Sequence, residues 1–589
     1  MKSYKNKILI GFGLLATMFG CKKTETFPVQ NVSAIYIFDP RDSAGANAQK
    51  YLFGIYYILP DGVDRVGGDY LDAASDDAVS PSANSQCQIL SSGGYSSISL
   101  PAGEDLWSNV VTNGLGNTPL SYTSMWSGIR YANNFINNIP IVPVKGSVNG
   151  VSNRYVWQSE ARFLRAQFYF ELIKRFGGVP LIGNKVFEIS DDLSLPRNNF
   201  ADCVNYIVSE CDAIKDSLLT VPLANNAQDS YRATKGAALA LKAHVLLYAA
   251  SPLYNDPAGA NSNPLLGYTD YSAARWQAAA NAAQAVIALN AYQLDTVYKN
   301  VFLNQNSPEI IFRRTNDFGT TIETNNGPIG YPSAMGNGRT DPTQDLVDSY
   351  PMANGLAITD PTSGYDPNNP YTNRDPRLAA NVLTNGATWL STSLQTYEGG
   401  VSKPNSGVQQ TLTGYYMHKF MGPDESGTQF TKHLEDWISL RYGEILLDYA
   451  EAQNEVAGPN STATGGSYTP YTALEALRKR AGIAQGTNGL YGLTAGMTQA
   501  QMRTAIQNER RIEMAFEEQR YFDIRRWKIA ETVMNQPRMG VSINNSNGNL
   551  TYNYVPVFTT KFVAPKMYYY PIPYAEVLKN PNMKQNPGW

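Results

Sequence analysis

The sequence predicts a mostly α-helical protein in which irregular helix pairs form a scaffold and loop-rich segments pack against it. Apolar residues recur at helical spacing in several segments that are separated by short loops. This pairing resembles tetratricopeptide-type helix–turn–helix stacking, but the regular 34-residue repeat is missing. The helical scaffold is expected at about 42–60, 121–290 and 435–535. The loop-rich parts, with many Asn, Gly, Pro and Tyr, are expected at about 61–120, 291–430 and 539–589.

The clearest helix ends at Gly177-Gly178, with Pro180 beyond it, which is a typical helix C-terminus. Its apolar stripe has the spacing 4-3-4-4, and Phe163 and Phe170 fall on another face, which predicts cover on two sides. The stripe consists of Trp157, Ala161, Leu164, Phe168 and Leu172. Further helices are expected at about 42–59, 121–138, 199–219, 234–250, 272–289, 435–457, 472–481 and 498–517, with strand and turn after Met539.

Length and composition exclude several classes of protein. The 589 residues suggest about four domains as a first estimate. A hydrophobic content of 43 % is enough to form a core, which excludes a disordered chain. The net charge of −3 gives no basic excess for binding nucleic acid. Charged residues make up only 16 %, whereas aromatic residues reach 11 % with Tyr the most frequent.

The N-terminus reads as a targeting segment. Lys2, Lys5 and Lys7 precede a mostly apolar run over 8–19, which is shorter than the roughly 20 residues of a spanning helix. Residues 1–20 are therefore expected to be a signal peptide. Gly20-Cys21 resembles a bacterial lipobox, so Cys21 is the expected lipid attachment site. The alternative is an ordinary signal peptide followed by a chance cysteine.

The remaining cysteines are Cys87, Cys203 and Cys211, an odd number that forms no complete disulfide framework. Cys203 and Cys211 lie eight residues apart in a predicted helix, about 12 Å along its axis, which is too far for a disulfide. We expect all three to be small buried side chains. No metal site is expected, because no pair of Cys or His has ligand spacing.

Acidic residues gather in the segment 508–520, where Glu509, Glu513 and Glu517 share one helix face. Arginines surround them and would lower carboxyl pKa values, which is unsuitable for a general acid. An ion-pair network that ties this helix to the tail is therefore the favoured interpretation.

A second acidic run contains Asp69, Asp72, Asp76 and Asp77. It could bind Ca²⁺, but it lacks EF-hand spacing. Capping and turn hydrogen bonds are the favoured interpretation.

Several segments resemble the SusD/RagB family of nutrient-binding outer-membrane lipoproteins of Bacteroidetes. The resemblance covers nearly the whole mature chain in order. It rests on Glu160 to Ala166 with Phe176 to Pro180, Ser307 to Phe312, Pro342 to Asp348, Asn373 to Leu378, Leu440 to Leu447 with Ala450 to Ala452, Asn508 to Trp527, and the ending from Pro571 to Trp589.

The resemblance implies one domain over 21–589 with four tetratricopeptide-like helix pairs and a loop-rich ligand-binding part. It implies a lipid-anchored protein of the outer membrane that faces the extracellular side. Such a protein binds oligosaccharides or other nutrients without cleaving them, and passes them to a SusC-like TonB-dependent transporter. No cofactor and no metal are implied.

Ligand-binding residues are expected among aromatic side chains of the irregular segments, because a sugar ring presents C–H bonds that stack on an aromatic face. The candidates are Tyr95, Trp107, Tyr268, Phe318, Tyr331 and Trp389. Trp126 falls in a helical pattern shared by the family and is expected in the core. Two other functions stay open: a secreted glycoside hydrolase, which needs two acids in one pocket, and a helical-repeat scaffold for protein interactions.

Overall fold

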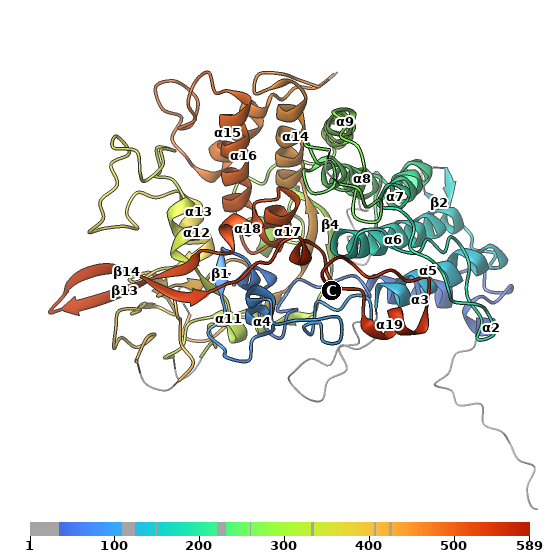
Figure 1. The fold of residues 1–589 in the computed structure, drawn as a ribbon, viewed down its shortest axis with the longest axis horizontal. Helices are drawn as coiled ribbons and strands as arrows, with labels where there is room; N and C mark the ends of the chain where they lie inside the picture. The colour runs from blue at the N-terminus through green and yellow to red at the C-terminus, as the bar shows by residue number, and fades with distance from the viewer. Residues whose placement is uncertain are drawn as a thin grey trace, which may run out of the picture.

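The computed structural model describes residues 34–108, 124–148, 150–220, 231–259, 261–331, 335–405, 408–422, 427–463 and 465–589. In this part of the chain, paired helices lie on one side and a long hairpin with loop-rich segments lies on the other (Figure 1). The helices α14 (Tyr442–Ala457), α15 (Pro470–Ala481) and α16 (Gln499–Glu513) stand between the two sides. This arrangement confirms the prediction of a mostly helical fold.

The helical side is built by packing each helix on the next. The helix α3 (Ala46–Tyr56) contacts α5 (Met125–Asn138), and α5 contacts α6 (Asn153–Phe176). The series continues from α6 to α7 (Phe200–Ile214), then to α8 (Lys235–Ala250), α9 (Ala274–Ala288) and α14. The expected helix pairs are therefore present.

Side-chain caps explain where four of the helices begin. The hydroxyls of Ser124, Thr234, Thr469 and Thr498 accept backbone N–H groups at the starts of α5, α8, α15 and α16. These caps satisfy donors that the first helical turn leaves without an intrahelical partner.

The helix α6 is covered on two sides, as its sequence predicts. Phe163 packs edge-on against Phe312 of β4 (Ile310–Arg314), with 4.9 Å between ring centroids. On another face, Phe170 packs against His244 and Tyr248 of α8. Through its contact with β4, α6 therefore links the helical side to the segment after residue 291.

Two of the predicted helices differ clearly in the structure from the bounds that the sequence predicts. The segment expected as a helix over 435–457 begins with strand β12 (Trp437–Arg441), which pairs antiparallel with β4, and α14 starts only at Tyr442. The helix expected over 498–517 ends at Glu513, because Phe516 and Glu518 have φ angles of 64° and 61°. Pairing and turn geometry set by distant segments override the local helical pattern in both cases.

The other elements are short. The helices are α2 (Ala34–Ile37), α4 (Gln86–Ser92), α10 (Asn300–Leu303), α11 (Thr321–Asn326), α12 (Gln344–Ser349), α13 (Pro376–Asn381), α17 (Gln519–Arg526), α18 (Ala530–Val533) and α19 (Tyr574–Lys579), with 3-10 turns at Leu71–Ala74, Ile139–Ile141, Lys215–Ser217 and Lys566–Tyr568. The short strands are β1 (Ala78–Val79), β2 (Ser147–Val148), β3 (Val151–Ser152), β5 (Phe318–Gly319), β6 (Asp341–Pro342), β7 (Val382–Leu383), β8 (Thr388–Trp389), β9 (Thr392–Ser393), β10 (Tyr416–Met417) and β11 (His433–Leu434). They pair as β1–β6, β2–β3, β5–β11, β7–β10 and β8–β9.

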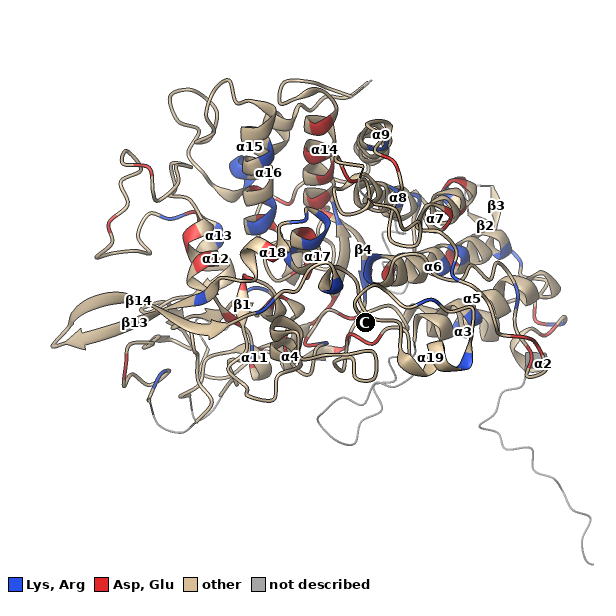
Figure 2. Ribbon diagram, viewed as in Figure 1, with Lys and Arg blue, Asp and Glu red and all other residues tan. Residues whose placement is uncertain are grey.

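The tail forms an antiparallel hairpin of β13 (Pro537–Ser546) and β14 (Asn549–Thr559), with register shifts between Arg538 and Met539. This confirms the prediction of strand and turn, whereas the short helix α19 in the tail was not predicted. The hairpin projects away from the helices and carries few charges (Figure 2).

The acids of α16 form a buried ion-pair network, which confirms the structural interpretation of that cluster. Glu513 contacts Arg377 of α13 at 2.9 Å and Arg441 of β12 at 2.8 Å. Glu509 contacts Arg377 and Arg478, and Glu517 contacts Arg441 and Lys419. The expected tie to the tail is wrong, because these partners come from α13, α15 and β12 and from the loop before residue 420. Figure 2 shows the charges gathered on α14 to α17.

The acidic run before β1 holds the end of α16 in place. Asp72 accepts the backbone N–H groups of Phe516 and Glu518, both at 3.1 Å. Asp76 pairs with Arg520 at 2.8 Å, and Asp77 pairs with Arg511 at 2.6 Å. Capping accounts for Asp72, as the favoured interpretation expected, whereas the ion pairs of Asp76 and Asp77 with arginines were not predicted.

A buried hydrophobic cluster includes side chains from Phe38 to Met583 and so spans both sides of the molecule. Cys87, Cys203 and Cys211 are free and buried, as predicted. No helix among the described residues is long and apolar enough to cross a membrane. The segment 1–20, expected to be a signal peptide, and Cys21, the expected lipid attachment site, lie outside the described residues.

Candidate functional site

A cavity of about 520 Å³ opens beside α13 in the loop-rich part. Ala379, Leu378 and Pro376 of α13 form an apolar wall. The remaining lining residues are Ala380 of the same helix and residues from the segments around it, which include polar groups: Lys299, Tyr371, Asn373, Arg374, Asp375, Val382, Leu383, Thr384, Ala387, Thr388 and His418. We call this space the α13 cavity. Its size and its mixture of apolar and polar groups are typical of small-molecule sites.

The segment Asn373 to Leu378 explains the rigid wall of this cavity. Asn373 adopts a left-handed conformation with φ 56°, which turns the chain before the helix. The side chain of Asp375 then caps α13 by accepting the N–H of Arg377, and Pro376 occupies the first turn. Because Arg377 also pairs with Glu509 and Glu513, the cavity wall is held against the scaffold helix α16.

Four tyrosines lie beside the cavity, and we call them the tyrosine cluster: Tyr365, Tyr371, Tyr552 and Tyr554. The ring of Tyr371 lines the cavity and packs edge-on against Tyr552 of β14, with 5.8 Å between centroids. The hydroxyls of Tyr365 and Tyr554 lie 3.4 Å apart, and Tyr554 is 43 % exposed. The cluster therefore extends from the cavity to the exposed face of the hairpin.

Several polar groups at the cavity are already used inside the protein. Arg374 donates to the carbonyl oxygens of Pro370, Val347 and Tyr350, and burial lowers the pKa of its guanidinium. Asp375 is held by Arg377. The exposed side chains of Asn373 and Thr388 are the polar groups of the lining that face solvent.

Three of the residues predicted to bind ligand are buried, so those predictions are wrong. Tyr95 is 3 % exposed and packs against Trp589, and Trp107 is 5 % exposed and packs against Phe176. Trp389 is fully buried and packs against His418 and Phe430. The loops fold onto the scaffold, and large rings gain most from burial in that interface.

Trp126 packs against Trp107 and Tyr169, in keeping with its expected place at the core.

The other three predicted residues keep accessible surface but lie apart. Tyr268 is half-buried, and the guanidinium of Arg275 lies 3.5 Å from its ring centroid. Phe318 of β5 is 64 % exposed. Tyr331 is half-buried, and its hydroxyl accepts a hydrogen bond from Thr392 at 3.5 Å. Their role in ligand binding stays a prediction.

Sequence reasoning missed the tyrosine cluster because its members come from segments almost 200 residues apart. Tyr552 and Tyr554 alternate along β14 and point to one face of the hairpin. That alternation, together with the tyrosines at 365 and 371, was the available signal. Neither segment's own sequence predicts that the two pack against each other.

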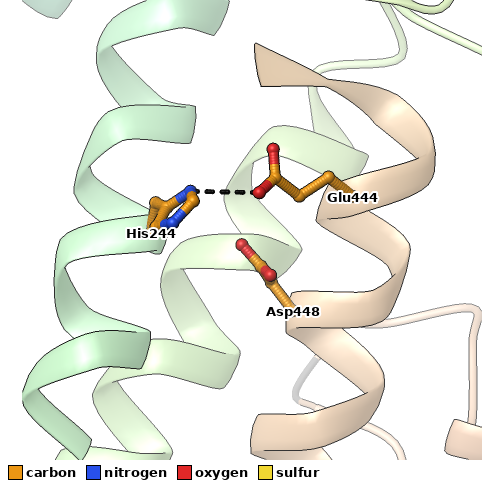
Figure 3. A group of neighbouring side chains, drawn as sticks. All are labelled: His244, Glu444 and Asp448. Carbon is orange, nitrogen blue, oxygen red and sulfur yellow. Dashed lines mark ion pairs between the residues drawn. The ribbon is translucent and has the colours of Figure 1, made fainter. Parts of the chain in front are cut away.

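A second polar cluster is fully buried between α8 and α14. Figure 3 shows His244 facing Glu444 and Asp448, with 3.3 Å between His244 Nδ1 and Glu444 Oε1. Burial raises the pKa of Glu444 to about 8 and that of Asp448 to about 6, and it lowers the pKa of His244 well below its usual value.

Arg510 already supplies a positive charge to this cluster, at 2.6 Å from Asp448 and 3.3 Å from Glu444. A metal ion would have to compete with that guanidinium. The neighbouring cavity of about 50 Å³ has room for water but not for a sugar ring. The raised carboxyl pKa values therefore reflect a buried structural cluster rather than a glycosidase site.

Comparisons with known proteins point to one family. The chain matches the model of the SusD family over 308–589 and the model "Starch-binding associating with outer membrane" over 69–247. It is 25 % identical to SusD-like protein P2 of Formosa agariphila over 475 residues, which cover 78 % of each chain.

Solved structures agree with this result. A SusD-like carbohydrate-binding protein from Bacteroides fragilis is 24 % identical, with a TM-score of 0.68 over 92 % of this chain and 99 % of that one. A laminarin-binding SusD-like protein is 20 % identical, with a TM-score of 0.61 over 93 % of this chain and 100 % of that one. These structures show that the chain has their fold.

Proposed function

Because the chain belongs to the SusD/RagB family, we propose that it binds an oligosaccharide at the α13 cavity and the tyrosine cluster and delivers it to a transporter. Proteins of this family bind glycans and work with SusC-type transporters. The single observation that carries the location is that Tyr371 lines the cavity and also belongs to the tyrosine cluster, which reaches solvent at Tyr554.

The chemistry of the site suits a sugar chain. Tyrosine rings offer apolar faces for the C–H groups of pyranose rings, and each ring also has a hydroxyl that forms hydrogen bonds. Asn373 and Thr388 add amide and hydroxyl groups at the cavity. A site that is open to solvent and must release its ligand needs only modest affinity, which a small apolar contact area provides.

We propose that the bound glycan is not cleaved. A retaining glycosidase needs two carboxyl groups about 5–5.5 Å apart, and an inverting one about 6.5–9.5 Å apart, on either side of the scissile bond. Among the described residues, Asp375 is the only carboxylate that lines the α13 cavity, and it is buried and paired with Arg377. This supports binding without hydrolysis.

The proposal includes a lipid anchor at Cys21, the outer leaflet of the outer membrane as the location, and a SusC-like TonB-dependent transporter as the partner. The lipobox-like sequence before Cys21 supports the anchor. The family description "associating with outer membrane" supports the location.

Affinity electrophoresis with laminarin, starch and other polysaccharides tests glycan binding. Retarded migration on at least one of these polysaccharides, without release of reducing ends, is the expected result. Release of reducing ends from a retarding polysaccharide would favour the hydrolase instead. Co-purification from detergent-solubilised outer membrane tests the partner: a TonB-dependent transporter is expected, and its absence contradicts delivery but not glycan binding.

A further inference from the structure

Glu323, His433 and Glu435 form a compact group in the loop-rich part. Glu323 belongs to α11, His433 begins β11, and Glu435 follows that strand. One ligand atom of each side chain lies within 4.8 Å of the other two. His433 Nε2 lies 2.7 Å from Glu323 Oε1. Two segments, α11 and the one that contains β11, therefore bring an imidazole and two carboxylates to one point.

The carboxylate of Glu323 is incompletely satisfied. Glu323 is fully buried, and its Oε2 has no hydrogen-bond partner among the described residues. A buried carboxylate oxygen without a partner is costly, so this atom indicates a missing cation or donor.

Two carboxylates face a single imidazole, so the group keeps a net negative charge even when His433 is protonated. Among the residues that the structure describes, no lysine or arginine forms an ion pair with Glu323 or Glu435. Asp64 lies nearby and is held by Asn325 and Asn326 at 2.8 and 2.6 Å, and burial raises the pKa of its carboxyl well above the usual value. The cluster of His244 is different, because Arg510 supplies its positive charge.

Two glycines leave space for the group. A Cβ atom on Gly319 would collide with Oε2 of Glu435, and one on Gly422 would lie 2.9 Å from Cδ2 of His433. The backbone N–H of Gly422 donates to Glu323 Oε1 at 2.7 Å, and the N–H of Ile322 donates to Glu435 Oε1 at 2.9 Å. These hydrogen bonds orient both carboxylates, as outer-shell donors do at metal sites.

We propose that Glu323, His433 and Glu435 bind one divalent transition-metal ion of the zinc type. One imidazole nitrogen and two carboxylate oxygens are a ligand set that suits Zn²⁺, with a fourth position left for water. Two ligand atoms on one tetrahedral Zn²⁺ lie about 3.3 Å apart, so the His433–Glu323 contact of 2.7 Å needs to open by about 0.6 Å.

A metal ion here would clamp the short sheet that carries Phe318. His433 and Leu434 of β11 pair with Gly319 and Phe318 of β5. The ion would join α11 to this sheet through side chains rather than through an apolar core. It would therefore fix the exposed ring of Phe318 on the loop-rich surface, independently of the proposed glycan site.

The test is calorimetric titration of the full chain, stripped with a chelator, with Zn²⁺ and separately with Ca²⁺. Binding of one Zn²⁺ per chain, tighter than Ca²⁺, is expected. In His433→Gln the amide still donates to Glu323 but is a poor metal ligand, so affinity should fall at least tenfold. The same loss is expected for Glu435→Gln.

Glu444→Gln is the matched control, because it changes a buried carboxyl of the other His-carboxylate cluster. Its zinc affinity should equal that of the unmodified chain. The site would be overturned if His433→Gln and Glu435→Gln both bound zinc as tightly as the unmodified chain does. Binding of less than one ion per unmodified chain would also overturn it. If His433→Gln does not fold by circular dichroism, Glu435→Gln decides alone. Tighter binding of Ca²⁺ than of Zn²⁺ would overturn the assigned metal class.

Discussion

The hydroxyl of Tyr371 donates to the hydroxyl of Tyr415 at 3.2 Å. Tyr415 in turn donates to Gln344 Oε1 at 2.6 Å, so a chain of hydrogen bonds connects the cavity to α12. Burial raises the pKa of Tyr371, so its hydroxyl stays protonated and remains a donor at neutral pH. The ring of Tyr371 is thus fixed in position before any ligand arrives, which lowers the entropic cost of binding.

We predict that Tyr554→Ala weakens glycan binding about tenfold, which corresponds to about 1.4 kcal/mol. The side chain is 43 % exposed, so the melting temperature should change little. Affinity electrophoresis on a polysaccharide that retards the unmodified protein measures the effect. Tyr155→Ala is the control, because Tyr155 is similarly exposed at the start of α6. Equal retardation of both variants would place the glycan elsewhere.

Trp107→Ala should destabilise the protein by about 3–5 kcal/mol, the usual cost of truncating a buried tryptophan. Trp107 fills space between Trp126 and Phe176, so its removal leaves a cavity in the core. Chemical denaturation measures the change in the free energy of unfolding. Phe318→Ala serves for comparison and should change it by no more than about 0.5 kcal/mol, because this ring is exposed. A stability loss of similar size in both would show that Trp107 is not a core residue.

Arg377→Met should also cost about 3–5 kcal/mol, because it leaves Asp375, Glu509 and Glu513 buried with one cation fewer. Arg503→Met breaks a partly exposed pair with Glu455 and should cost only about 0–1 kcal/mol. Denaturant unfolding of both variants gives the comparison. If Arg377→Met proves no more destabilising than Arg503→Met, the network does not hold α13 in place.

Stability should fall as the pH rises toward 8, in part because of Glu444. Its folded-state pKa of about 8 lies above the unfolded value, so its protonated form favours the folded state. This contribution is complete below the unfolded pKa of about 4.3 and is lost as the pH rises through the folded pKa. Glu444→Gln cannot ionise and should show a flatter dependence between pH 5 and pH 8. Unfolding free energies at several pH values check this, and parallel curves for the two proteins would contradict it.

The sequence predicted the scaffold better than the site. The stripe from Trp157 to Leu172 fixes α6 without help from other segments, because helical periodicity is a local property. The segment from Trp437 to Arg441 could not be assigned in the same way, since its strand depends on pairing with β4.

The prediction that Tyr95, Trp107 and Trp389 contact a ligand failed for a related reason. An aromatic residue in a loop such as Trp389 can stack on a ligand or fill the interface between loop and scaffold, and composition does not distinguish the two. The tyrosine cluster depends on β14 lying beside Tyr365 and Tyr371, which only the three-dimensional structure reveals.

The network around Arg377 has a consequence for how such proteins diversify. A single replacement in the network leaves at least one buried charge without its partner. The residues concerned are Arg377, Arg441, Glu509 and Glu513, and we expect them to be retained together in related sequences. Tyr554 and Asn373 can be replaced without leaving a buried charge unpaired, because their side chains are exposed. If the proposed glycan site is correct, a lineage can therefore change the sugars that it recognises one substitution at a time, while the framework beneath stays constant.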